Sequence, residues 1–156
     1  KFIENSVMSG LDGLTIPDLP VEENQEIFEI ARKNDFKIVC FIAPTTTDQR
    51  VSLITQKAQG FLYYISVVGI TGIRDKLPDD IIQNINKLKQ MTNIPVAVGF
   101  GVSTSEHAKL IGTVADGVIV GSAIMREIEK YAKEPSEELV RGVGEFVGQL
   151  ISGAKG

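Results

Sequence analysis

The chain has no tryptophan, one histidine and one cysteine among its 156 residues. A single cysteine excludes an internal disulfide and a cysteine-cluster metal site, so we expect neither a disulfide framework nor a bound metal. Cys40 lies inside the apolar run from Ile38 to Ile42. This position predicts a small, buried side chain in a reduced, cytoplasmic protein.

Long apolar runs and runs of basic charge are also missing. No apolar stretch approaches the roughly 18 residues of a membrane span, and no signal peptide is visible. The formal net charge is −4, with acidic and basic residues interspersed, which argues against nucleic acid or an anionic membrane as the main partner. A small anionic ligand remains compatible with this charge, because backbone N–H groups and helix N-termini bind phosphate inside acidic proteins.

Short β-branched apolar runs alternate along the chain with longer segments of helical period. Strands are predicted at Leu14–Pro17, Lys37–Ala43, Phe61–Ser66, Pro95–Phe100 and Gly117–Val120. Helices are predicted at Phe2–Ser9, Glu22–Asn34, Asp48–Lys57, Pro78–Met91, Ser105–Gly112, Ser122–Lys133 and Ser136–Ile151. The strands are nearly all apolar instead of alternating, which indicates a parallel sheet with both faces covered. We therefore predict one α/β domain over residues 1–156.

Five parallel strands fit two architectures. One is a complete doubly wound sheet, which suits a chain of this length. The other is the last five strands of a (β/α)₈ barrel of about 250 residues, in which roughly 90 residues would precede Lys1. The barrel is favoured because the chain opens in a predicted helix with no strand before it, and because of where its glycines lie.

Glycines follow the fourth and fifth predicted strands. Gly99 and Gly101 end the fourth strand, and Gly121 with Ser122 ends the fifth and leads directly into a helix. Barrel enzymes often bind phosphate at the loops after their last two strands. Glycine suits that task because it leaves backbone N–H groups accessible, and Ser122 adds a hydroxyl at the positive end of a helix. Turn or packing glycines are the alternative for either motif alone; together they predict a phosphate site.

A third loop follows the strand that contains Tyr63 and reads Gly69–Arg74. Two glycines that flank Thr71 are typical of a loop that closes over a substrate. The amide of Gly72 is a candidate for the same phosphate, and Thr71 for orienting a catalytic carboxylate. A plain surface loop is equally compatible with this spacing.

Four segments together resemble the tryptophan synthase alpha chain family. They are Leu14–Glu23, Gly60–Gly72, Val98–Ser103 and Asp116–Ile124. They keep the order of that family's fourth, sixth, seventh and eighth strands, and the resemblance covers essentially the whole chain. The Pro-Asp-Leu-Pro and Gly-Ile-Thr-Gly sequences within them are the most discriminating.

The resemblance implies a lyase that cleaves indole-3-glycerol phosphate into indole and glyceraldehyde 3-phosphate, working in an α₂β₂ complex with a beta chain that carries pyridoxal phosphate. This chain would hold no cofactor of its own. The matching positions place Gly72, Gly101, Gly121 and Ser122 on the phosphate. They place Tyr63, Thr71, Ile42 and Phe100 around the indole and the closing loop.

The family's two catalytic carboxylates would fall before Lys1, so we expect no catalytic residue in this chain and no turnover by it alone. Asp18 is the one strand-end carboxylate, and we expect it to cap the turn from Pro17 to Pro20 or to face a partner. His107, in a polar helical stretch, is expected to be solvated. Two alternatives remain open: another phosphate-binding barrel enzyme of the sugar-phosphate isomerase class, and a non-enzymatic doubly wound binding module.

Overall fold

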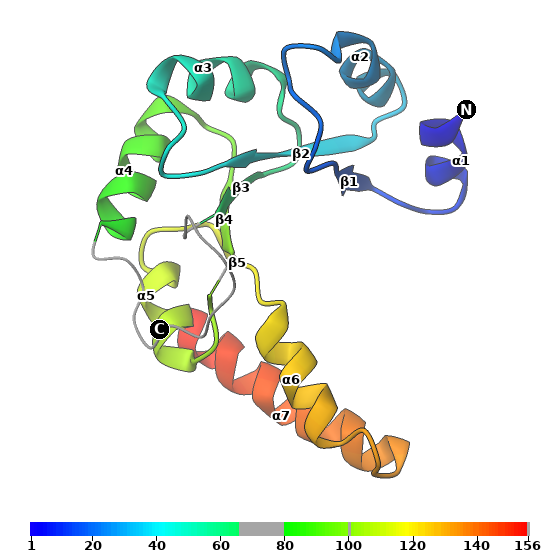
Figure 1. Cartoon of the computed structure of the whole chain (residues 1–156), viewed down its shortest axis with the longest axis vertical. Coiled ribbons are helices and arrows are strands. Elements are labelled where there is room, and N and C mark those ends of the chain that lie inside the picture. The colour runs from blue at the N-terminus through cyan, green and yellow to red at the C-terminus, as the bar shows by residue number, and fades with distance from the viewer. Residues whose placement is uncertain (66–79, 100, 156) are drawn as a thin grey trace.

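A computed structural model describes residues 1–65, 80–99 and 101–155. Its strands and helices alternate over most of the chain (Figure 1). The strands are β1 (Gly13–Thr15), β2 (Lys37–Ile42), β3 (Leu62–Ile65), β4 (Val96–Gly99) and β5 (Gly117–Val118). The helices are α1 (Phe2–Met8), α2 (Gln25–Lys33), α3 (Asp48–Lys57), α4 (Ile81–Met91), α5 (Ser105–Gly112), α6 (Ser122–Lys130) and α7 (Ser136–Lys155).

The five strands form one sheet in the order β1-β2-β3-β4-β5, and every neighbouring pair is parallel. A doubly wound sheet has a point at which the strand order reverses. No reversal occurs here, so the order is that of consecutive strands in a barrel. The predicted parallel α/β architecture is confirmed, and the doubly wound alternative is excluded.

The sheet is curved, and helices α2 to α5 lie along its outer side (Figure 1). Alternate residues of the central strands point into this helix layer: the buried side chains include Ile38, Cys40, Leu62, Val96 and Val98. They pack with apolar residues of the helices into one core. Cys40 is buried as expected, and this desolvation raises the pKa of its thiol to about 11.

Local signals explain several helix ends. Gly10 follows α1 with a φ of +82°, and the N–H groups of Gly10 and Leu11 donate to the carbonyls of Val7 and Ser6. This is the closing motif for which glycine is favoured, because a side chain is strained at positive φ. At α5 the Thr104 hydroxyl accepts a hydrogen bond from the N–H of His107 at 3.2 Å and so caps the start of the helix.

Some predicted boundaries are wrong. Helix α2 begins at Gln25 and not at Glu22, because the chain turns there, with Glu23 N–H donating to the Pro20 carbonyl at 3.3 Å. Strand β5 has two residues instead of the predicted four, and α7 continues to Lys155. The expected start of α4 at Pro78 lies outside the described residues.

The prediction that His107 is solvated is also wrong. Its side chain is only 8% exposed. Helix α5 is covered by α7 as well as by the sheet: a Cβ on Gly112 would meet the Ala154 backbone, and one on Gly153 would meet Ser105. The polar neighbours of His107 in the sequence gave no sign of its burial.

Candidate functional site

The ends of β4 and β5 bring the predicted phosphate residues to one edge of the sheet. Val98 pairs with Val118 in the parallel register, and Ile119 N–H donates to the Val98 carbonyl at 2.8 Å. Gly101 and Gly121 each follow their paired valine by three residues, so both come after the ends of neighbouring parallel strands. Gly101 has a φ of +83°, a backbone conformation that few side chains adopt.

Helix α6 begins directly at this edge. Its N-cap is Gly121, and its first residue is the exposed Ser122. The N–H groups of Ser122 and Ala123 have no acceptor within the helix, as in the first turn of any helix, and they carry the positive end of its dipole. A Cβ built on Gly121 would meet no atom within 4 Å, so the space in front of it is open. This arrangement suits an anion bound by backbone amides.

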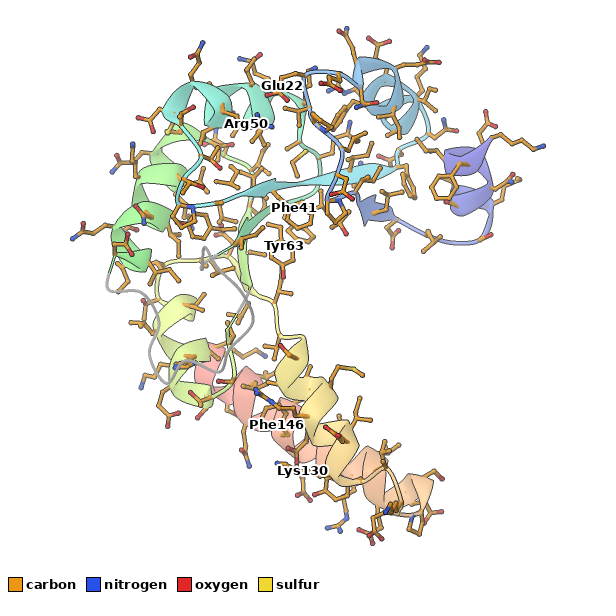
Figure 2. All side chains as sticks on the ribbon, viewed as in Figure 1. Glu22, Phe41, Arg50, Tyr63, Lys130 and Phe146 are labelled. Atoms are coloured by element: carbon orange, nitrogen blue, oxygen red, sulfur yellow. The ribbon has the colours of Figure 1, made fainter. Side chains whose placement is uncertain are left out.

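The inner face of the sheet carries an aromatic pair beside small residues. Phe41 pairs with Tyr63, Tyr63 with Ala97, and Ala97 with Gly117, so the four form one row across β2 to β5. The rings of Phe41 and Tyr63 lie 5.0 Å apart at 41°. Figure 2 shows both on the side of the strands away from α3 and α4. The row thus has large aromatic rings at one end and small residues at the other.

Gly99 fixes where the Tyr63 ring lies. A Cβ on Gly99 would come within 2.6 Å of the Cε1 and Cζ atoms of Tyr63 and would also overlap its hydroxyl. The ring therefore lies across the backbone of β4 where only glycine leaves room. Partial burial raises the pKa of the Tyr63 phenol, so its hydroxyl keeps its proton at neutral pH.

Ile42 does not reach this face, which corrects the expectation that it lines the indole slot. It is 3% exposed and lies in a row with Tyr64 and Val98, toward the helix layer. Successive side chains of a strand point to opposite faces, so Phe41 occupies the inner position instead. The sequence analysis did not select Phe41. Its strand pairs with that of Tyr63, and the residue opposite Tyr63 is Phe41.

The remaining predicted residues are not all placed. Thr71, Gly72 and Phe100 lie outside the described residues. Asp18 is exposed, and no hydrogen bond or ion pair reaches its carboxylate within the described part of the chain. The turn is closed instead by the N–H of Leu19, which donates to the Ile16 carbonyl at 3.2 Å. The expected cap by Asp18 is therefore not formed.

The described residues hold no cluster of three or more histidine, cysteine, aspartate or glutamate side chains placed to bind a metal ion. Nor does any described helix have the length and apolar character to cross a membrane.

The family model for the tryptophan synthase alpha chain matches residues 1–154 of this chain. The chain belongs to the tryptophan synthase alpha chain family. The alpha chain of Thermoanaerobacter sp. (strain X514) is 42% identical over 151 residues, which are 96% of this chain and 56% of that relative.

Solved structures of alpha chains are similar to this chain in fold. The Legionella pneumophila str. Paris alpha subunit superposes with a TM-score of 0.83 at 29% identity, over 99% of this chain and 56% of that one. The alpha chain in a structure of the Pyrococcus furiosus a2b2 complex gives 0.80 at 38% identity, over 94% and 60%. The chain thus spans about half the length of the alpha chains it matches. Its five-stranded sheet corresponds to the C-terminal part of their (β/α)₈ barrel.

Proposed function

We propose that this chain supplies the phosphate-binding and aromatic-binding half of a tryptophan synthase alpha subunit, which cleaves indole-3-glycerol phosphate to indole and glyceraldehyde 3-phosphate. The main support is that Gly101 and Gly121 follow the ends of the paired strands β4 and β5, beside the N-terminus of α6. Family membership supplies the substrate class, and this edge supplies donors for its phosphate.

The phosphate is held mainly by backbone donors. N–H groups at Gly101, Gly121 and Ser122, with the Ser122 hydroxyl, surround one anion, and Gly72 adds an amide from its loop. Because these donors carry no formal charge, binding tolerates the chain's net charge of −4. It also depends less on salt than a lysine cluster would.

The indole ring lies on the inner face of the sheet. Tyr63 and Phe41 form one wall, and the small side chains of Ala97 and Gly117 leave room beside them. Phe100 and Thr71 complete the slot and its closing loop in this proposal. Burial and ring contacts then hold the indole, while the glycines fix the other end of the substrate.

Cleavage also needs proton transfer at the indole ring and at a glycerol hydroxyl. The described inner row of Phe41, Tyr63, Ala97 and Gly117 contains no carboxylate or imidazole. We therefore propose that the chain by itself binds the substrate's ends and turns none of it over. The cytoplasmic complex would contain a beta chain with pyridoxal phosphate, by analogy with the Pyrococcus furiosus a2b2 complex.

A pair of aspartate substitutions tests the phosphate site. Gly121→Asp puts a carboxylate where the anion would bind, and the matched Gly144→Asp puts one on α7; both positions are open. We expect Gly121→Asp to weaken binding of inorganic phosphate and of indole propanol phosphate by about tenfold or more, from charge repulsion in the site. Gly144→Asp should leave both affinities unchanged.

Calorimetric titration of the two ligands measures this. Aspartate is a favourable N-cap residue, so Gly121→Asp should not unfold α6. Equal phosphate affinity in the two variants would contradict the site. If indole propanol phosphate binds no more tightly than inorganic phosphate, the proposed substrate is wrong.

A further inference from the structure

Strands β1 and β2 separate before β2 ends. Their pairing stops at Thr15 and Val39, whereas β2 continues to Ile42 beside β3. After β1 the chain turns, and the N–H of Leu19 donates to the Ile16 carbonyl at 3.2 Å. Within the described part of the chain, the last residues of β2 therefore have a strand on one side only.

A cavity of about 140 Å³ lies where the two strands separate. Leu19 and Val21 line it from the segment after β1, Phe28 from α2 and Ile54 from α3. Arg50 is the only charged residue among the described residues that line it. Cavities of about 150 Å³ with apolar walls stay dry and bind molecules of the size of benzene. The volume and the walls of this cavity therefore suit one small ring.

The charge of Arg50 is already paired. Its guanidinium lies 3.1 Å from the Glu22 carboxylate, and Figure 2 shows the two side chains between α3 and the segment before α2. Beside them, Lys57 Nζ donates to the Val21 carbonyl at 2.6 Å. Both contacts join the segment after β1 to α3, and Arg50 and Val21 themselves line the cavity. Because Arg50 has its carboxylate partner, an uncharged ligand is favoured over an anion.

The backbone of Phe41 supplies a polar group to this cavity. Phe41 lines the cavity, although its ring lies against Tyr63. Successive N–H groups of a strand point to opposite sides, and that of Lys37 donates toward β1, to the Asp12 carbonyl at 2.9 Å. The N–H of Phe41, four residues later, points the same way, beyond the end of β1. No hydrogen bond from it is found within the described part of the chain, so it is available to a ligand oxygen.

We propose that this cavity binds a small, uncharged aromatic molecule that carries one hydroxyl group, of the size of phenol. The ring packs against Leu19, Val21 and Ile54, and the hydroxyl oxygen accepts from the N–H of Phe41. The walls from α2 and α3 place the site on the helix side of the sheet, whereas Tyr63 lies on the inner face. The inference therefore does not depend on phosphate or indole binding.

Calorimetric titration with phenol and with benzene tests the site. Phenol is expected to bind the chain with a Kd of about 1 mM. Benzene has no oxygen to accept the hydrogen bond and should bind about two- to tenfold more weakly. Val21→Leu places an extra methylene group in the cavity and should weaken phenol binding by about tenfold or more.

Val51→Leu is the matched control. Val51 and Val21 are both 5% exposed, and Val51 is not among the described residues that line the cavity. This variant should keep its phenol affinity within about twofold. Circular dichroism checks that both variants fold. Absence of phenol binding, or equal loss in the two variants, would overturn the inference.

Amide NMR spectra of the unchanged chain locate the ligand without any substitution. Phenol should shift the signals of Leu19, Phe41 and Ile54 and leave those of Ala97 and Gly117 in place. Shifts confined to Ala97 and Gly117 would overturn the inference, because phenol would then occupy the inner face of the sheet. Equal affinities for phenol and benzene would overturn the hydrogen bond from Phe41.

Discussion

At the scale of single residues, Gly99 controls the position of Tyr63. Gly99→Ala places a methyl group within 2.6 Å of the Tyr63 ring carbons, so the ring or strand β4 must shift. We expect a loss of about 1–3 kcal/mol of folding free energy, the usual cost of overpacking a fitted site. Urea unfolding of the variant measures it.

The Tyr63→Ala background is the control. There the ring is absent, so Gly99→Ala should cost little more than the propensity difference between the two residues. A cycle of the four proteins gives the coupling between the positions. If Gly99→Ala costs the same in both backgrounds, the clash is not with Tyr63.

Asp116 links the starts of β4 and β5. Its carboxylate accepts from Lys89 Nζ at 2.8 Å and from the Val96 N–H at 2.9 Å. The hydrogen bond from Lys89 has the larger effect and the one from Val96 the smaller, and together they lower the pKa of Asp116 below its usual 3.8. A lowered pKa means that the stabilisation is present above the unfolded-state pKa and is lost as the pH falls through the folded-state pKa.

Asp116→Asn should therefore cost about 1 kcal/mol at neutral pH, and the gap from the unchanged protein should shrink below about pH 4. Lys89→Met removes the ion pair and leaves the bond to Val96, so it should cost less. Thermal unfolding between pH 3 and 7 compares the three proteins. A gap that stays constant over this range would show that the charge of Asp116 has no part in it.

Single residues also show which parts of the candidate site could be predicted from the sequence and which could not. Gly101 and Gly121 were predicted as phosphate residues because a strand followed by glycine and a helix is a local pattern. Ile42 was placed on the wrong face, because a continuously apolar strand gives no alternation from which to infer its facing. The register with Tyr63 supplies that information, and it is a relation between strands far apart in the sequence.

At the scale of elements, α7 approaches α5 through glycines. A Cβ on Gly153 would lie 3.0 Å from the carbonyl carbon of Ser105 and overlap its oxygen, whereas one on Gly148 would meet nothing within 4 Å. Both glycines lie in the same helix. Gly148→Ala should stabilise the protein by about 0.5–1 kcal/mol through helix propensity. Gly153→Ala should destabilise it by about 1–3 kcal/mol through the forced separation of the helices.

Chemical denaturation of these two variants separates propensity from packing. If both substitutions stabilise the protein, α7 does not lie against α5 as described. If both destabilise it, Gly148 faces a neighbour.

The elements themselves were largely predictable. Helix α5 was predicted with the observed bounds, because Thr104 offers a cap, and Gly10 marks the end of α1. The start of α2 was missed because Glu22 and Glu23 are good helix formers, while a turn with Pro20 governs the backbone there. Burial of His107 was missed because its neighbours in the sequence are polar, and burial depends on elements that pack against the helix from elsewhere in the chain.

At the scale of the molecule, the strand order carries information that no single segment holds. Parallel strands were evident from their apolar character, yet the same character suits a doubly wound sheet. Sequential pairing from β1 to β5 decides between the two. The sequence favoured the barrel only through indirect features, the predicted helix at its start and the positions of its glycines.

The five-stranded sheet also bears on activity, because its described inner row carries no carboxylate or imidazole to transfer a proton. We expect no indole release from indole-3-glycerol phosphate by the chain alone. A complex with the segment that precedes the matched region in the Thermoanaerobacter alpha chain should release it, because closing the barrel brings further strand ends, and any acidic groups they carry, around the inner face of the sheet. In that complex Gly121→Asp should abolish release, and Gly144→Asp should retain it, as colorimetric assay of indole would show. Release by the chain alone would mean that one of its own groups transfers the proton, and Asp18, exposed at the end of β1, would be the first residue to substitute.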